Sequence, residues 1–255
     1  MNPIVAKLIL KVLRFQVWPQ KNNWLPRWQA HRGYCLDGAR ENTLASLAQA
    51  HSKKFEMAEI DVRLSEDDIP VLAHDQNLLR LVGVNKKVSQ MAASELAQQD
   101  FPSLEQVLKT TNRPRKINIE IKNDNSLHLH LEHKIIQVIK ACKKTEDVMV
   151  SSFNPFSLIP FAQQLPDVPR ALLIEQDILA SLSYLRLAGS LVARPHMVNW
   201  PKGLLTRRLV QFLKSNGVPV AVWTVNDQPQ ARELFSWGVD SVITDRILPD
   251  VLGEN

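Results

Sequence analysis

The sequence predicts an α/β protein built as a TIM-type (β/α)8 barrel. The chain has 255 residues, about the size of one such barrel. Its fractions of hydrophobic and charged residues, 45% and 22%, are ordinary for a globular protein. Short β-rich runs alternate with helical patterns, and this alternation gives parallel strands joined by crossover helices. We therefore expect one barrel over residues 27–253, preceded by an N-terminal segment over residues 1–26.

Nine runs are predicted to be strands, one more than a barrel needs. They are WQAH (28–31), MAEIDV (57–62), IPVLAH (69–74), KINIEIK (116–122), DVMVSSF, RALLIE, HMVNW, PVAVWTV and DSVIT. The connection from the second run to the third is too short for a helical crossover. The third run is therefore either a hairpin-like excursion at the barrel mouth or a barrel strand that lacks its helix. The barrel is expected to be irregular at this connection.

Helical patterns fill most of the intervals between these strands. They cover residues 43–55, 94–110 and 127–143, and QARELFSWG ends at Gly238, which suits the position after a helix. Asn42-Thr43 is expected to cap the first of these helices. The pattern over 94–110 is broken by DFPS, where Ser103 is a plausible N-cap. Residues 75–102 form a short insertion after the third strand.

The N-terminal run IVAKLILKVLRFQVW predicts an amphipathic basic helix. Lys7, Lys11 and Arg14 recur at helical spacing on one face, and the run is too short and too charged to span a bilayer. Residues 1–20 could lie weakly on an anionic membrane surface, or the helix could cover the bottom of the barrel. The sequence leaves both readings open.

Charge and cysteine content limit the partners and the compartment. The net charge of +5 permits an anionic partner, but the chain has no zinc-finger spacing and no RNP-type aromatic motif, so no nucleic-acid partner is expected. The two cysteines, Cys35 and Cys142, form no CxxC motif and no disulfide framework. We expect a cytoplasmic protein, either free or peripheral at the inner face of the membrane.

Acidic residues occur at alternate positions of two predicted strands. Glu59 and Asp61 share one face of the second strand, and Glu120 and Lys122 share one face of the fourth. Inside a barrel rim these faces converge, and buried acids are costly unless they are paired or bind metal. Three carboxylates without a thiolate suit one hard divalent cation, Mg²⁺ or Ca²⁺. The alternative is that Glu59 and Asp61 contact surface arginines.

Two histidines stand at strand ends close to these acids. His31 opens the stretch HRG, and His74 closes PVLAHD. One histidine can accept a proton while the other donates one, as displacement at phosphorus requires. Arg32 and Lys122 would hold the phosphate oxygens, the arginine as a two-pronged donor and the lysine as a point charge. A lone strand-end histidine would be unremarkable, but the pair indicates a phosphate-handling site.

Together the motifs resemble the glycerophosphodiester phosphodiesterase family. HRG, ENT, EIDV, PVLAHD, NIEIK, SSF, VWTVN and GVDSVITD occur in the family's order over about residues 28–250. The resemblance implies metal-dependent hydrolysis of a small-molecule glycerophosphodiester to sn-glycerol 3-phosphate and an alcohol. It implies that His31 and His74 are the acid–base pair and that Glu59, Asp61 and Glu120 are the metal ligands. It also implies that Arg32, Lys122 and Trp223 bind the substrate; a core position is the alternative for the tryptophan.

The sequence departs from the family pattern in two places. Asp67-Asp68-Ile69 replaces the usual Asp-Gly before Pro-Val, so Asp68 is expected to take the positive φ that glycine usually permits. The segment after His74-Asp75 is short, which suggests an open mouth and leaves the preferred head group unassigned. The alternative activity is that of a lysophospholipase D acting on lipid substrates at the same site. A catalytically inactive phosphate-binding module is disfavoured because both histidines and all three acids are present.

Overall fold

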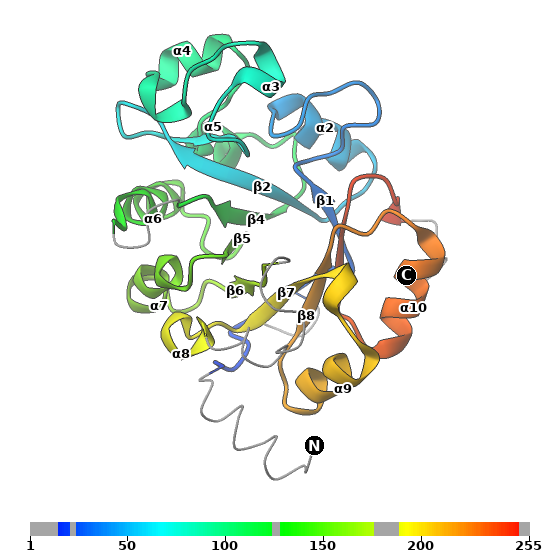
Figure 1. Cartoon of the computed structure of the whole chain (residues 1–255). Coiled ribbons are helices and arrows are strands. Elements are labelled where there is room, and N and C mark those ends of the chain that lie inside the picture. Colours follow the sequence, from blue (N-terminus) through cyan, green and yellow to red (C-terminus); the bar gives the residue numbers. More distant parts are fainter. Residues whose placement is uncertain (1–14, 21–23, 124–127, 176–188, 250–255) are drawn as a thin grey trace.

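A computed structural model describes residues 15–20, 24–123, 128–175 and 189–249, and its strands close into a barrel (Figure 1). The strands are β1 (Trp28–His31), β2 (Met57–Leu64), β3 (Pro70–Leu72), β4 (Lys116–Ile121), β5 (Val148–Ser152), β6 (Arg170–Leu173), β7 (Met197–Pro201), β8 (Val220–Trp223) and β9 (Ser241–Thr244). All except β3 pair in parallel, and β1 pairs with both β2 and β9. The predicted eight-stranded TIM-type barrel is confirmed.

The ninth strand lies outside the barrel. β3 is antiparallel to β2, with Val62 opposite Leu72, so it forms a hairpin-like excursion from the end of β2. The turn between the two strands is too short to hold a crossover helix. Asp68, in this turn, has φ +62°, as the departure from the family pattern predicts. The irregular connection is therefore a hairpin that extends β2 beyond the barrel mouth.

Helices surround the barrel on its outer side (Figure 1). They are α2 (Leu44–Ser52), α3 (Leu79–Val82), α4 (Ala93–Gln98), α5 (Leu104–Lys109), α6 (His130–Cys142), α7 (Ile159–Gln164), α8 (Ser190–Ala193), α9 (Arg207–Ser215) and α10 (Gln228–Trp237), with 3-10 turns η1 (Val88–Gln90), η2 (Pro155–Leu158) and η4 (Lys202–Leu204). Ser103 caps α5 as predicted, accepting from the Gln106 amide. Gly238 ends α10 with φ +103°. Ser103 and Gly238 therefore mark the start of α5 and the end of α10, as the sequence predicts.

The insertion over residues 75–102 carries α3, η1 and α4 beside β2 and β3 (Figure 1). It has a hydrophobic cluster separate from the main core. That cluster comprises Val71, Ala73, Leu78, Val88, Met91, Leu96 and Phe101. The insertion is thus a small packed unit, and its inner edge faces the end of β2.

The amino-terminal end of the barrel is closed by large side chains. Met57, Met149 and Met197 form an apolar floor inside the strands, and Trp18 and Trp24 pack against it. Gln16 donates its backbone amide to the Pro195 carbonyl (2.8 Å), and the Trp24 indole donates to the Glu146 carbonyl (2.9 Å). Residues 4–14 of the predicted N-terminal helix lie outside the described residues, and residues 15–18, the end of the predicted run, are not helical. The two alternatives for this helix, a membrane surface or the bottom of the barrel, stay predictions. Trp18 and Trp24 close the barrel floor.

A polar layer lies above this floor. The Gln29 amide donates to Ser241 Oγ (2.9 Å) and accepts from the Asn118 amide (3.0 Å), and Ser151 Oγ donates to Asn118 Oδ1 (3.0 Å). All four side chains are fully buried or nearly so. Their hydrogen bonds pair the buried amides of Gln29 and Asn118 and connect β9, β1, β4 and β5 across the interior.

Candidate active site

Three carboxylates meet at the carboxyl end of the barrel. Glu59 and Asp61 project inward from β2, and Glu120 does so from β4, because Asp61 and Glu120 are register partners on neighbouring strands. One ligand oxygen from each lies within 4.8 Å of the others. All three side chains are largely buried, and Glu59 Oε1 has no hydrogen-bond partner. Because Glu59 and Asp61 are buried, the alternative that they contact arginines at the protein surface is wrong.

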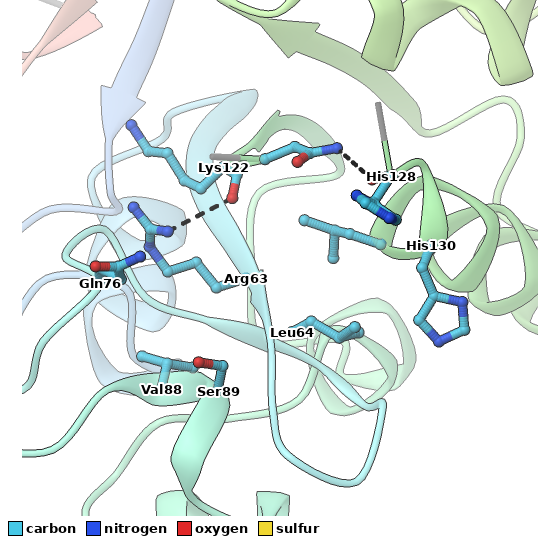
Figure 2. Close-up of a pocket in the computed structure, with 10 residues that line it drawn as sticks. Arg63, Leu64, Gln76, Val88, Ser89, Lys122, His128 and His130 are labelled. Carbon is cyan, nitrogen blue, oxygen red and sulfur yellow. Dashed lines mark hydrogen bonds between the residues drawn. The ribbon is translucent and has the colours of Figure 1, made fainter. Parts of the chain in front are cut away.

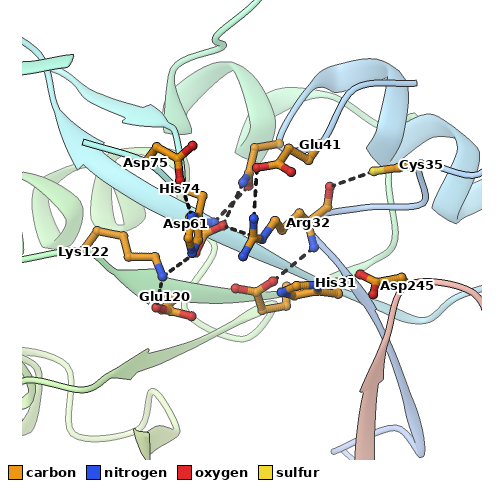
Figure 3. Close-up of polar contacts among 12 residues, drawn as sticks. His31, Arg32, Cys35, Glu41, Asp61, His74, Asp75, Glu120, Lys122 and Asp245 are labelled. Atoms are coloured by element: carbon orange, nitrogen blue, oxygen red, sulfur yellow. Dashed lines mark hydrogen bonds and ion pairs between the residues drawn. The ribbon is translucent and has the colours of Figure 1, made fainter. Parts of the chain in front are cut away.

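Two cations balance part of this negative charge (Figure 3). Lys122 Nζ contacts Asp61 Oδ1 (2.9 Å) and also bonds the Glu120 carboxylate. Arg32 Nε lies 3.3 Å from Asp61 Oδ2, and the Arg32 backbone amide donates to Glu59 Oε2 (3.1 Å). Three acids therefore face two basic side chains within a largely buried cluster.

Burial and the neighbouring charges shift the pKa values of the three acids in different directions. Burial raises the pKa of Glu59 to about 8, and the adjacent Asp61 charge adds to this increase. Burial would also raise the pKa of Asp61, but Lys122 and Arg32 hold it well below its usual range. The pKa of Glu120 is raised, first by burial and then by Asp61. When no cation is bound, Glu59 therefore keeps its proton at neutral pH, whereas Asp61 stays ionised between Lys122 and Arg32.

The two histidines lie on either side of the cluster, each with a carboxylate partner. His31 Nδ1 is 2.6 Å from Asp245 Oδ1, and His74 Nδ1 is 2.7 Å from Asp75 Oδ1. Burial acts to lower the pKa of both. For His31 the hydrogen bond to Asp245 and the Glu59 charge reverse the effect, so its pKa is raised, whereas the pKa of His74 is lowered. The partner on Nδ1 leaves Nε2 of each ring available for chemistry.

The HRG stretch requires its glycine. Gly33 has φ +82°, and a Cβ there would lie 2.3 Å from Ser46 Oγ and 2.7 Å from the Ser46 carbonyl carbon. The start of α2 therefore packs directly on the backbone that follows Arg32. No other residue would let the chain turn so closely beneath the helix.

Asn42 has a different role from the one predicted. It was expected to cap α2 together with Thr43, but only Thr43 is the N-cap, accepting from the Ser46 amide (3.1 Å). Asn42 adopts φ +56° and turns its amide toward β2 instead. Its Nδ2 donates to Asp61 Oδ2 (2.8 Å), and its Oδ1 accepts from the Asp61 amide (3.0 Å). Asn42 thus orients a carboxylate of the cluster.

A second layer of charges ties the insertion to the site. Arg80, on α3, donates to Glu41 and, through Nε, to Asp75 Oδ2 (2.5 Å). Glu41 in turn accepts from Arg32 Nη1 (3.0 Å). A continuous chain of ion pairs therefore runs from His74 through Asp75, Arg80 and Glu41 to Arg32.

An aromatic pair stands at the mouth beside these residues. Trp223 ends β8 and donates its indole N–H to the Asn199 carbonyl (3.2 Å). Its ring meets Phe153 edge-on, with centroids 5.6 Å apart, and Lys122 Nζ is 5.9 Å from the Phe153 centroid. Trp223 is half-buried, so the alternative of a fully buried core tryptophan does not describe it.

The structure brings the predicted residues together at one end of the barrel. It adds Asn42, Arg80 and Asp245, which sequence reasoning missed. Each of these bonds at least one partner that is distant in the chain, so no local spacing marks that contact. Cys35 also lies nearby, where burial raises the pKa of its thiol to about 11. That shift disfavours the thiolate, which is the nucleophilic form of a cysteine.

Comparisons with known proteins agree with this geometry. Residues 31–248 match the model of the glycerophosphoryl diester phosphodiesterase family. A glycerophosphodiester phosphodiesterase of Bacillus altitudinis is 28% identical over 85% of this chain and 93% of its own. A human lysophospholipase D is 25% identical over 95% of this chain and 90% of its own. Both relatives are therefore similar to this chain over nearly their full length.

A solved structure is similar over the same region. It is an Oleispira antarctica phosphodiesterase in complex with its product, sn-glycerol 3-phosphate. Its sequence is 26% identical, the match covers 87% of this chain and 94% of that one, and the TM-score is 0.74.

Proposed function

This chain belongs to the glycerophosphoryl diester phosphodiesterase family, and we propose that it hydrolyses glycerophosphodiesters to sn-glycerol 3-phosphate and an alcohol with the aid of one divalent cation. The observation that carries the proposal is the arrangement at the barrel mouth. Three buried carboxylates stand between two histidines, and an arginine and a lysine face the same space (Figure 3).

The three carboxylates fit a hard cation. Their oxygens lie within 4.8 Å of one another, and the buried Glu59 Oε1 has no hydrogen-bond partner. Carboxylate oxygens are the donors that Mg²⁺ and Ca²⁺ prefer. We propose Glu59, Asp61 and Glu120 as the ligands. When bound, the cation would stabilise the negative charge that develops on phosphate oxygens.

Arg32 and Lys122 are the proposed phosphate holders. Both are held in place by carboxylates, Arg32 by Glu41 and Asp61, and Lys122 by Asp61 and Glu120. Because their positions are fixed before substrate arrives, little ordering cost remains for binding. Trp223, paired with Phe153, is proposed to form an aromatic wall against the substrate.

His31 and His74 are the proposed acid–base pair. Each Nδ1 is engaged by an aspartate, which fixes the ring and directs Nε2 away from that partner. One ring would remove the proton from the attacking oxygen, and the other would protonate the departing alkoxide. The attacking oxygen is either water, which gives sn-glycerol 3-phosphate directly, or the substrate's own 2-hydroxyl, which gives a cyclic phosphate that water then opens. The proton balance of the reaction is closed by these two rings, with no need for a nucleophilic side chain.

The proposed function is tested with a panel of diesters assayed with and without EDTA. The expected result is release of sn-glycerol 3-phosphate from glycerophosphodiesters, lost on chelation and restored by Mg²⁺ or Ca²⁺. If the product never contains sn-glycerol 3-phosphate, the assignment is wrong. The choice between the two cations follows from which one restores turnover.

A lysophospholipase D activity is the second candidate. The observation that favours it is the similarity to the human lysophospholipase D over 95% of this chain. Phe153 and Phe156 add exposed apolar surface, each being more than a third exposed. A lysophospholipid included in the same panel would show this activity as lysophosphatidic acid release.

We further propose that the protein is cytoplasmic and contacts the inner face of the membrane weakly through residues 1–20. In the described part of the chain, no helix is long and apolar enough to cross a bilayer. The basic residues Lys7, Lys11 and Arg14 support surface binding, at about 1 kcal/mol each near anionic lipid. Co-sedimentation with anionic vesicles at low salt, compared with a chain lacking residues 1–14, tests this contact.

A further inference from the structure

A cleft of about 240 Å³ lies beside the candidate active site. It runs between the insertion and the start of α6 (Figure 2), with Arg63, Lys122 and Gln76 on one side and His128 and His130 on the other. Its remaining lining residues are Leu64, Val88, Ser89, Asn123 and Leu131. Nothing in the proposed chemistry so far uses this space.

Two contacts join the cleft to the reacting groups. Lys122, a proposed phosphate holder, is part of its wall. Arg63 donates from Nε to the His74 carbonyl (2.9 Å) and from Nη1 to the Lys122 carbonyl (3.5 Å). One arginine therefore spans the ends of the strands that carry His74 and Lys122, and its side chain lines the cleft. A group that leaves the phosphorus on this side would enter the cleft.

The lining residues define the chemistry of that group. Seven of the ten carry polar side chains, most of them hydrogen-bond donors, and the other three are aliphatic. None of the ten is a carboxylate or a phenylalanine, tyrosine or tryptophan. Quaternary ammonium groups are recognised by the ring faces of tryptophan, tyrosine and phenylalanine, and none of these three residues lines the cleft. A neutral polyhydroxy group can hydrogen-bond the polar side chains and lay its C–H surface on the aliphatic ones.

We propose that this cleft binds the alcohol head group of the substrate and selects neutral polyols, of the glycerol and inositol class, over choline. The proposal rests on the proposed function, since it assigns the second half of the same diester. The turn that carries Asp68 closes one edge of the cleft, where Asp68 Oδ2 is 3.0 Å from His130 Nε2. His130 is therefore held in the wall by this pair. The His128 ring lines the cleft, and the His128 backbone carbonyl accepts from Asn123 Nδ2 (2.9 Å).

The test compares three glycerophosphodiesters: the inositol, choline and methyl esters. The measured quantity is the ratio of kcat/KM for the inositol ester to that for the methyl ester, which has almost no head group. Two variants change the cleft. His128→Ala removes one hydrogen-bonding ring and leaves the backbone contact, and Ser89→Phe fills the space. His51→Ala, an exposed histidine on α2, is the matched control.

The ratio is expected to fall about fivefold in His128→Ala, the effect of one lost hydrogen bond, and further in Ser89→Phe, while His51→Ala keeps the wild-type ratio. A wild-type preference for the choline ester, or unchanged ratios in both cleft variants, would overturn the proposal. Calorimetric titration of the EDTA-treated enzyme with the inositol and methyl esters separates this from failure of the proposed function. Tighter binding of the inositol ester, weakened in Ser89→Phe, supports the cleft even without turnover, and equal binding of both esters counts against it.

Discussion

The Arg80 guanidinium on α3 donates hydrogen bonds to both carboxylate oxygens of Glu41. The same side chain bonds Asp75, which holds His74, while Glu41 holds Arg32. Arg80 touches neither the carboxylate cluster nor the space between the histidines. It is therefore a positioning residue, which aligns a proposed acid–base group and a proposed phosphate holder from a single point in the insertion.

Replacing this arginine is expected to slow turnover without preventing folding. Because Arg80 is half-exposed, Arg80→Gln should lower kcat about tenfold, through hydrogen bonds to charged partners worth about 1.4 kcal/mol in total. Arg80→Lys should recover only part of this, since a lysine cannot bridge both carboxylates.

A double-mutant cycle with Asp75→Asn distinguishes positioning from a general loss of stability. If Arg80 acts through Asp75, the two changes together cost less than the sum of their separate effects on kcat. Additive effects would contradict the coupling. Lys109→Gln, which breaks the exposed pair with Glu105, is the control and should leave kcat unchanged.

Metal binding should be visible without turnover. A ligand that binds only the folded state stabilises it, so Mg²⁺ or Ca²⁺ is expected to raise the Tm of the EDTA-treated wild type. Glu59→Gln and Glu120→Gln each remove a proposed ligand charge, and both variants should show a much smaller rise. Thermal melts with increasing cation measure this directly, and an equal rise in all three proteins would show that the cation binds elsewhere.

Loss of either histidine is expected to affect the chemical step. His31→Ala and His74→Ala should each lower kcat by about 10²–10⁴, the usual range for a positioned acid or base. Steady-state kinetics on glycerophosphocholine and a circular dichroism spectrum of each variant make the measurement. A variant that keeps near-native kcat would identify its histidine as structural. His51→Ala serves as the matched control on the outer surface.

Acid should destabilise the fold through His196. This side chain is buried, accepts from the Arg170 amide at Nδ1 (3.1 Å), and has Arg170 Nη2 3.4 Å from Nε2. Burial, and then Arg170, lowers its pKa to about 3 from 6.5. The unfolded chain therefore takes up the proton first as the pH falls. The stability contribution is complete above about pH 6.5 and is lost progressively toward pH 3.

At pH 4.5 this loss should reach about 2–3 kcal/mol, at 1.36 kcal/mol for each pKa unit. His196→Asn keeps an acceptor for the Arg170 amide but cannot be protonated. Urea unfolding at pH 7 and pH 4.5 measures both proteins. The variant is expected to lose less stability between the two values than the wild type. Equal losses would assign the acid sensitivity to other groups.

The barrel floor makes a prediction about the N-terminal segment. Trp24 packs against the floor, donates to the Glu146 carbonyl and lies under Lys116 Nζ, 5.4 Å from its ring. Because it is only partly buried, Trp24→Ala should cost about 2 kcal/mol, below the range for a fully buried tryptophan. That corresponds to a fall in Tm of about 4–8 °C. Differential scanning calorimetry is the measurement, and an unchanged Tm would show that the floor does not need this ring.

Much of the fold could be predicted because its signals are local. The alternation in KINIEIK predicts both the β4 strand and the inward direction of Glu120. The spacing of Glu59 and Asp61 predicts that both side chains lie on one face of β2. Ser103 and Gly238 marked helix ends through their own backbone preferences. In each case, the residue type and its immediate neighbours contain the physical cause.

The features that escaped prediction depend on contacts between distant residues. The placement of β3 could not be predicted, because its short connection allows either a hairpin with β2 or a barrel strand without its helix. Asn42 looked like a helix cap because its type suits one, yet its partner is Asp61 in the next strand. Arg80 and Asp245 gave no signal, since an ion pair formed across the fold has no spacing in the sequence.

The polar layer in the barrel also restricts how the strands can assemble. Gln29 bonds Ser241 on β9 and Asn118 on β4, so the first strand is linked to the last and to the fourth through one side chain. If a strand slipped by two residues, an amide would face a methionine of the floor and remain unpaired. Such misregistered barrels are penalised by the desolvation of each buried amide. The layer thus acts against incorrect closure and couples the unfolding of β1 to that of β9.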